Sequence, residues 1–174
     1  MTSVAPSTQS VPQGSKFLFD WTGVDLTAVV ATPEEIGKVN PHRGNMALLD
    51  AVVWVSPDMT KAIGKVHFRG DEFFAAGHFP GKPMFPGVLM IEAGAQLANW
   101  LFNVRTPIEN ICALLGIDEA RFRNPVEPGQ TMYILIDSLK WTSKRFASRV
   151  QGICNGAIVF ESTVVGIAID SKKQ

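Results

Sequence analysis

The segment from Val88 to about Asn103 carries the only long helical pattern in the chain, and apolar residues occupy nearly all of its sides. A helix without a broad polar face is expected to be largely buried. The segments after it are rich in β-branched residues and separated by turn signals, which predicts four strands, at 111–122, 131–141, 145–154 and 157–169. Asn155-Gly156 between the last two predicts a tight hairpin. One buried helix among successive antiparallel strands predicts an α+β architecture.

Two further strands are predicted before the helix, at 48–55 and 60–68. The second alternates, so that Ala62 and Val66 share one face while Ile63 and His67 share the other. His67 is therefore expected at the surface or in an interface.

The first residues read differently from the rest of the chain. Residues 1–16 are rich in Ser, Thr, Pro and Gln, which predicts a disordered tail. The next segment holds two short candidate elements, at 26–31 and 33–36, and is expected to pack on the outside of the domain. The predicted division is a tail at 1–16, an N-terminal extension of uncertain structure at 17–38, and one domain at 39–174.

Composition narrows the classes of function. The chain has 16 Lys and Arg against 16 Asp and Glu, so its formal net charge is zero, which argues against a nucleic-acid-binding protein. It has no apolar run near the roughly 18 residues that a membrane helix needs, and no secretory pattern at its N-terminus, so we expect a cytoplasmic protein. Cys112 and Cys154 lack metal-ligand spacing and are expected to be buried thiols, with one disulfide as the alternative.

Residues 77–96, GHFPGKPMFPGVLMIEAGAQ, hold the side chains that could carry chemistry. Three prolines stiffen the loop around His78, and a histidine held in place titrates near neutral pH, which suits a general base. Gly87 lies at the start of the predicted helix, where free backbone N–H groups favour negative charge and the missing side chain lets a ligand approach. A developing enolate oxygen would be stabilised there.

Glu92 follows Gly87 by about one and a half helical turns, roughly 7.5 Å along the axis. Among apolar neighbours its pKa should be raised by desolvation, so that it stays protonated and can donate to a leaving hydroxyl. Gln96, one turn further on, could orient that carboxyl. Structural interpretations stay open, since a histidine in a proline-rich loop is often structural and a glutamate in such a helix often faces solvent or pairs with a basic residue.

The motif at 77–96 closely resembles the active-site motif of the FabZ type of 3-hydroxyacyl-[acyl-carrier-protein] dehydratase. The resemblance covers about residues 39–169, with further matches at 40–43, 48–50, 71–74, 121–123, 125–126 and 128–129. Glutamate at 92 resembles this branch, whereas the related FabA branch has aspartate there. The resemblance implies a hot-dog fold, in which an antiparallel sheet wraps one long helix. It also implies a homodimer or a trimer of dimers, with the active site across the dimer interface.

Matching motif positions assign the roles that the resemblance implies. His78 and Glu92 are the catalytic pair, and Gly87 is the backbone donor to the thioester carbonyl. His42 is expected to cap or pack the tunnel entrance rather than to take part in catalysis. Support is expected from Gln96, Phe79 and Pro86, a substrate tunnel from Met84, Phe85 and Phe122, and carrier docking from Lys82, Arg105, Arg121 and Arg123.

The implied reaction removes water from a 3-hydroxyacyl thioester to give the trans-2-enoyl thioester, in fatty-acid or related acyl-chain synthesis. No metal and no cofactor are needed, and the expected partner is an acyl carrier protein whose phosphopantetheine arm holds the substrate. Coenzyme A is the alternative carrier. A hot-dog acyl thioesterase and a non-catalytic acyl-binding paralogue are the alternative functions. A thioesterase would aim a carboxylate or water at the carbonyl carbon rather than a histidine at the α-carbon, and the presence of both His78 and Glu92 argues against a non-catalytic paralogue.

The sequence departs from the family pattern in three places, which leaves the preferred acyl-chain length open. Gly44-Asn45-Met46 stands where the family usually has an aromatic residue and a proline. Phe85 is bulkier than the usual aliphatic residue, and the region before residue 39 is longer than usual.

Overall fold

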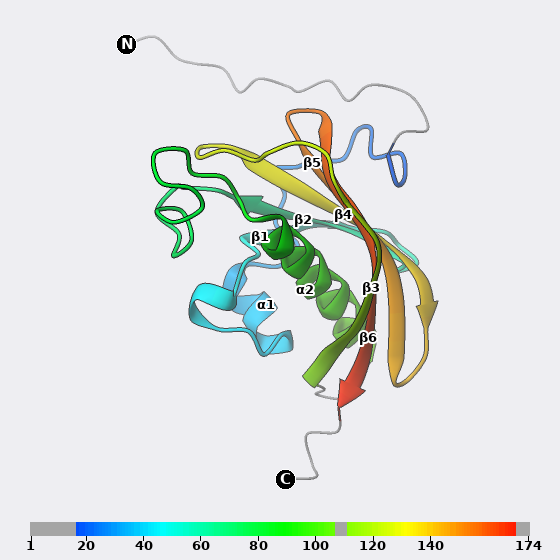
Figure 1. Cartoon of the computed structure of the whole chain (residues 1–174). Coiled ribbons are helices and arrows are strands. Elements are labelled where there is room, and N and C mark those ends of the chain that lie inside the picture. The colour runs from blue at the N-terminus through cyan, green and yellow to red at the C-terminus, as the bar shows by residue number, and fades with distance from the viewer. Residues whose placement is uncertain (1–16, 107–110, 170–174) are drawn as a thin grey trace.

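The computed structural model describes residues 17–106 and 111–169 as one long helix against a six-stranded antiparallel sheet (Figure 1). The strand order is β1-β2-β4-β5-β6-β3. This is the predicted α+β hot-dog fold. The elements are α1 (Pro33–Val39), a 3₁₀ turn (Gly44–Met46), β1 (Ala51–Val55), β2 (Lys61–His67), α2 (Gly87–Arg105), β3 (Ile111–Phe122), β4 (Thr131–Trp141), β5 (Arg145–Cys154) and β6 (Ala157–Ile169).

The predicted strand bounds are confirmed for β3 to β6 and nearly so for β2. Asn155 and Gly156 both have positive φ, as a tight hairpin turn between β5 and β6 requires. The prediction of a strand starting at residue 48 is wrong, since β1 begins at Ala51. The backbone N–H of Leu48 instead donates to the Gln96 side chain, which takes this residue out of the ladder.

The helix α2 lies against the concave face of the sheet, and α1 lies on the side of α2 that the sheet leaves open (Figure 1). Twelve of the 19 residues of α2 are buried, which confirms the prediction of a largely buried helix. At Gly94 the helix and sheet approach so closely that a Cβ would lie 2.4 Å from Cγ1 of Val150 on β5. Glycine at this position sets the distance between the two layers.

The two faces of the sheet have separate apolar cores. Ala62 and Val66 of β2 face the α2 side, whereas Ile63 faces the outer side, as the alternation predicts. Residues 17–26 cover that outer face: Trp21 is 5% exposed and the backbone N–H of Leu18 donates to Gln151 of β5, at 2.9 Å. The N-terminal extension thus packs as part of the domain, while residues 1–16 lie outside the described part of the chain.

The two edge strands of the sheet differ. At β1, the backbone of Ala31 forms a bridge with Val52, and the N–H of Val30 also donates to the Val52 carbonyl, at 2.8 Å. This bridge is all that forms of the element predicted at 26–31. The other edge, β3, pairs with β6 alone among the described residues and carries exposed apolar side chains: Ile111, Leu114, Leu115, Ile117 and Phe122.

Candidate active site

The His78 imidazole lies in the loop between β2 and α2, and the loop itself fixes its orientation. Its Nδ1 lies 3.0 Å from the carbonyl oxygen of Met84, and the backbone N–H of Met84 donates to the His78 carbonyl at 2.7 Å. The Phe79 ring stacks on the imidazole, with centroids 4.3 Å apart. Because a carbonyl oxygen can only accept, Nδ1 carries a proton, and in the neutral imidazole the lone pair then lies on Nε2. His78 therefore presents a ring nitrogen that can take a proton.

The helix α2 begins at Gly87, directly after this loop. Pro86 precedes it, and the Pro86 carbonyl accepts from the N–H groups of Leu89 and Met90, at 3.0 and 3.1 Å. A Cβ on residue 87 would lie 2.7 Å from the Phe122 ring of β3. Glycine is thus needed for Phe122 to pack over the N-terminus of α2, where backbone N–H groups lack intrahelical partners.

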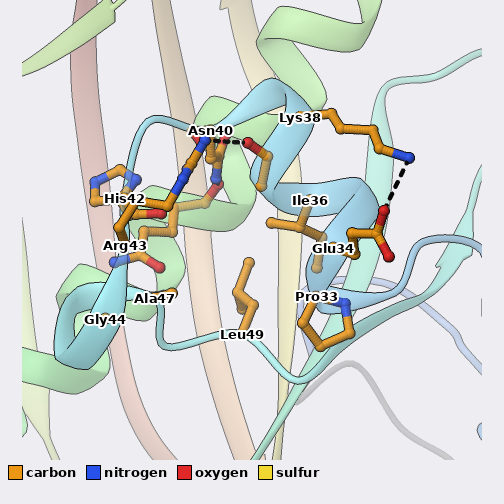
Figure 2. Close-up of a pocket in the computed structure, with 12 residues that line it drawn as sticks. Pro33, Glu34, Ile36, Lys38, Asn40, His42, Arg43, Gly44, Ala47 and Leu49 are labelled. Carbon is orange, nitrogen blue, oxygen red and sulfur yellow. Dashed lines mark hydrogen bonds and ion pairs between the residues drawn. The ribbon is translucent and has the colours of Figure 1, made fainter.

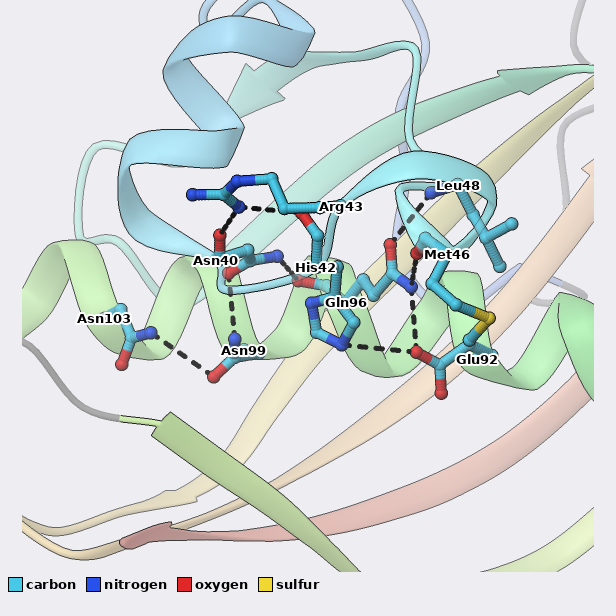
Figure 3. A network of polar contacts seen from close by, with 9 residues as sticks. All are labelled: Asn40, His42, Arg43, Met46, Leu48, Glu92, Gln96, Asn99 and Asn103. Atoms are coloured by element: carbon cyan, nitrogen blue, oxygen red, sulfur yellow. Dashed lines mark hydrogen bonds and ion pairs between the residues drawn. The ribbon is translucent and has the colours of Figure 1, made fainter. Parts of the chain in front are cut away.

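The Glu92 carboxyl is half-buried on the same helix and meets two nitrogen atoms through one of its oxygens (Figure 3). Nε2 of Gln96 donates to Oε1 at 2.8 Å, so the predicted contact between these residues is present. Nε2 of His42 lies 3.4 Å from the same Oε1.

The expectation of a raised pKa at Glu92 is wrong for the single chain. The contact with His42 lowers the pKa of Glu92, burial opposes this, and the Gln96 hydrogen bond lowers it further. These two nitrogen donors outweigh desolvation because they interact better with the carboxylate than with the acid. Near neutral pH the Glu92 side chain is therefore ionised in the unliganded chain.

Gln96 also holds the loop that precedes β1. Its Nε2 donates to the Met46 carbonyl at 2.7 Å, and its Oε1 accepts from the Leu48 N–H at 3.1 Å. One buried amide thus joins the 46–48 loop to the Glu92 carboxyl.

A further row of amide side chains continues from Gln96 along α2 (Figure 3). Asn40 donates to the Gln96 carbonyl and accepts from Asn99, both at 2.8 Å, and Asn103 donates to Asn99 at 3.4 Å. The sequence interpretation missed this row and the His42 contact. A signal for the row was present: Glu92 and the three polar residues at 96, 99 and 103 recur at helical spacing within an otherwise apolar helix.

His78 and Glu92 do not meet within one chain. No hydrogen bond or ion pair joins them among the residues that the structure describes. The two residues of the predicted catalytic pair thus lie apart, one on the loop before α2 and one on its second turn.

The residues predicted to line a substrate tunnel lie in three different settings. Phe85 is 4% exposed and packs edge-on against Phe68 and Phe74, with centroids 5.5 and 4.9 Å away. Met84 is half-buried beside His78, and Phe122 is 53% exposed over Gly87. Their tunnel role stays a prediction.

The four residues predicted to dock a carrier also differ. Arg123 pairs with Glu161, and the Arg105 guanidinium lies 4.9 Å from the centroid of the Trp141 ring. Lys82 and Arg121 are exposed and, within the described ranges, form no ion pair.

A cavity of about 350 Å³ lies between α1 and the loop after it (Figure 2). His42, Arg43 and Gln96 form part of its wall, and two of them contact Glu92. Over residues 17–106 and 111–169, no group of three His, Cys, Asp or Glu side chains is placed to hold a metal ion. In the same part of the chain, no helix has the length and apolar character needed to cross a membrane.

Comparison with known proteins points to one family. Residues 40–166 match the FabA-like domain. A 3-hydroxyacyl-[acyl-carrier-protein] dehydratase FabZ from Protochlamydia amoebophila is 30% identical over 139 residues, covering 80% of this chain and 90% of the relative. One from Yersinia enterocolitica is 39% identical over 138 residues, covering 76% and 80%. The dehydratase heterocomplex ApeI:P from Xenorhabdus doucetiae has a TM-score of 0.69 at 18% identity, covering 79% of this chain and 93% of that one, which is a likeness in fold.

Proposed function

Because this chain belongs to the FabA-like family and has FabZ relatives at 30 to 39% identity over most of its length, we propose that it removes water from a 3-hydroxyacyl thioester held on an acyl carrier protein. The product is the trans-2-enoyl thioester, an intermediate of fatty-acid or related acyl-chain synthesis. The observation that carries the proposal is the His78 imidazole, whose Nδ1 contact with the Met84 carbonyl leaves Nε2 as an acceptor.

His78 acts as the base. Its Nε2 takes a proton from the carbon next to the thioester carbonyl, and the C–H electron pair moves toward the carbonyl oxygen. The Gly87 N–H at the start of α2 stabilises the resulting oxyanion. When the C–C double bond forms, the C–O bond to the 3-hydroxyl breaks and that oxygen leaves as water.

Glu92 is the acid that protonates the departing hydroxyl. It has to take up a proton before this step, because the contacts within one chain favour its ionised form. Removal of bulk water when substrate enters raises the pKa of a carboxyl, which favours the protonated form in the complex.

The working unit is a homodimer in which His78 of one subunit meets Glu92 of the other. Two observations support this assembly: the pair has no contact within one chain, and the β3 edge exposes a row of apolar side chains. Exposed apolar edges are a common site of pairing with a second chain. A trimer of such dimers and a cytoplasmic location stay predictions.

The proposal is tested by incubating the purified protein with 3-hydroxyacyl and saturated acyl chains on both carrier protein and coenzyme A. Formation of the enoyl thioester is followed by absorbance, and thiol release is followed separately. We expect enoyl product from the carrier-linked 3-hydroxy substrate, and a loss of at least about a hundredfold in kcat/KM for His78→Ala and for Glu92→Gln. His67→Ala, a histidine that contacts Thr131 on the sheet, is the matched control.

Two outcomes would contradict the proposal. Thiol release from saturated substrates without enoyl formation would identify a thioesterase, and a folded His78→Ala variant with full dehydration activity would remove His78 from the mechanism. A mixture of His78→Ala and Glu92→Gln subunits should regain activity, since a mixed dimer holds one intact site. No recovery despite demonstrated subunit exchange would contradict the shared site.

A further inference from the structure

His42 contacts Glu92 through one ring nitrogen and one carboxylate oxygen. Its Nε2 lies 3.4 Å from Glu92 Oε1, and its Nδ1 is buried without a hydrogen-bond partner in the described part of the chain. A carboxylate oxygen only accepts, so Nε2 carries a proton. His42 thus directs an Nε2–H toward Glu92 Oε1.

The two oxygens of Glu92 differ as a result. Oε1 faces N–H groups from both His42 and Gln96, while Oε2 points away from both and has no partner among the residues described (Figure 3). Oε1 is thus already in contact with two nitrogen atoms. When the carboxyl takes up a proton, Oε2 is the oxygen left to hold it.

The backbone around His42 holds its ring in this place. The Arg43 guanidinium donates to the carbonyl oxygens of His42, Asn40 and Gly37, each at 2.7 Å. The Asn40 side chain is anchored to the Gln96 carbonyl of α2 at 2.8 Å. His42 thus sits on a segment that is tied to the helix carrying Glu92.

We infer that His42 is a positioning residue for the proposed dehydration, which with Gln96 occupies Glu92 Oε1 so that proton exchange with the 3-hydroxyl takes place at Oε2. The inference rests on the proposed function. His42 is the one titratable side chain of the described residues that faces Glu92 within the chain, and His78 of the partner subunit is the one that the proposed dimer adds. The lowered pKa of Glu92, to which the His42 contact is the largest contributor, agrees with this arrangement.

The kinetic test compares His42→Leu with His42→Gln. Leucine removes the N–H donor, whereas the glutamine amide can place an N–H near the position of the histidine Nε2. We expect His42→Leu to lower kcat on the order of tenfold to a hundredfold with little change in KM, because the acid is misdirected while substrate still binds. His42→Gln should recover most of that loss.

The pH profile gives a readout that a purely structural role would not move. Glu92 has to be protonated to act as the general acid, and its titration forms one limb of the pH profile of kcat/KM. Loss of an N–H donor destabilises the carboxylate, so the limb of His42→Leu should move to higher pH, while that of His42→Gln stays near the wild type. His67→Leu is the matched control and should leave the limb in place. A folded His42→Leu with unchanged kcat and an unchanged Glu92 limb overturns the inference.

A spectroscopic measurement on the wild-type protein separates this inference from the proposed function. Nitrogen chemical shifts of labelled histidine should show a proton on His42 Nε2, and an Nε2 without a proton overturns the inference. Carbon spectra of labelled glutamate, with Glu92→Gln to assign the signal, should show Glu92 titrating at higher pH in His42→Leu. If Glu92 titrates at the same pH in His42→Leu as in the wild type, the inferred effect of His42 on Glu92 is overturned. Neither result depends on dehydration activity, so an inactive wild type would count against the function alone.

Discussion

Replacement of Gly94 by alanine tests how closely α2 packs against the sheet. The added Cβ would lie 2.4 Å from Val150 Cγ1 and 3.6 Å from Phe160 Cζ, so that one of the layers has to move by about 1 Å to reach ordinary van der Waals contact. Val150 is 1% exposed and Phe160 is fully buried, which leaves little room for adjustment. Overpacking of this kind costs about 1–3 kcal/mol.

The intrinsic effect of the same substitution has the opposite sign. Alanine is favoured over glycine inside a helix by about 0.5–1 kcal/mol. Because the clash involves a buried β-branched side chain, we take the upper part of the overpacking range and expect Gly94→Ala to lower the free energy of unfolding by about 1–2 kcal/mol.

Urea unfolding followed by circular dichroism, at one fixed protein concentration, measures this change as a shift in midpoint at constant slope. The matched variant is Val150→Ala, which removes the Cγ1 methyl group that the added Cβ would clash with. Combined with Gly94→Ala it should cost less than the sum of the two single changes. A Gly94→Ala protein as stable as the wild type, or more stable, would refute the argument from close approach.

Three further predictions follow from the surface and from the charge of the site. Ile117→Lys on the exposed β3 edge should convert the protein to a monomer without dehydration activity, as measured by light scattering and enoyl formation. Lys82→Glu or Arg121→Glu should raise KM for carrier-linked substrate and leave turnover of a small pantetheine thioester unchanged, because exposed charges act mainly on association. Glu92 has a pKa below its ordinary value of 4.5 in the folded chain, so its contribution to stability is complete above that value and is lost as the pH falls through the folded pKa. The difference in unfolding free energy between the wild type and Glu92→Gln should accordingly shrink on acidification, and a difference independent of pH would contradict the His42 contact.

Local patterns predicted most of the fold. The bounds of β3 to β6 follow from runs of β-branched residues ended by Gly, Pro and Asn, which act within a few residues of each position. The start of β1 does not follow from such a local pattern. The backbone N–H of Leu48 donates to Gln96, which lies 48 residues away in the chain, and not to a neighbouring strand. Contacts at that separation leave no periodic trace in the sequence.

The candidate site likewise has features that local sequence patterns could predict and features that they could not. The residues at 78, 87 and 92 could be singled out because a rigid loop, a helix start and a carboxyl in an apolar helix are local features. The ionisation of Glu92 could not be predicted from the sequence. Its apolar neighbours in the helix indicated desolvation, but no local pattern indicated the contact with His42. In the proposed dimer His78 meets Glu92 of a second chain, and no pattern within one chain encodes such a contact.

The unequal edges of the sheet limit how copies of this chain can add to one another. Strand-to-strand growth into a ribbon needs two open edges on every copy, and here the backbone of Val30 and Ala31 already satisfies part of the β1 edge. In the proposed dimer, pairing through β3 would use the same edge on both partners, so that a two-fold axis would relate them and the second copy would offer no further β3 edge to a third. The short bridge at Ala31 covers part of the other edge, so strand-to-strand addition would end at two copies.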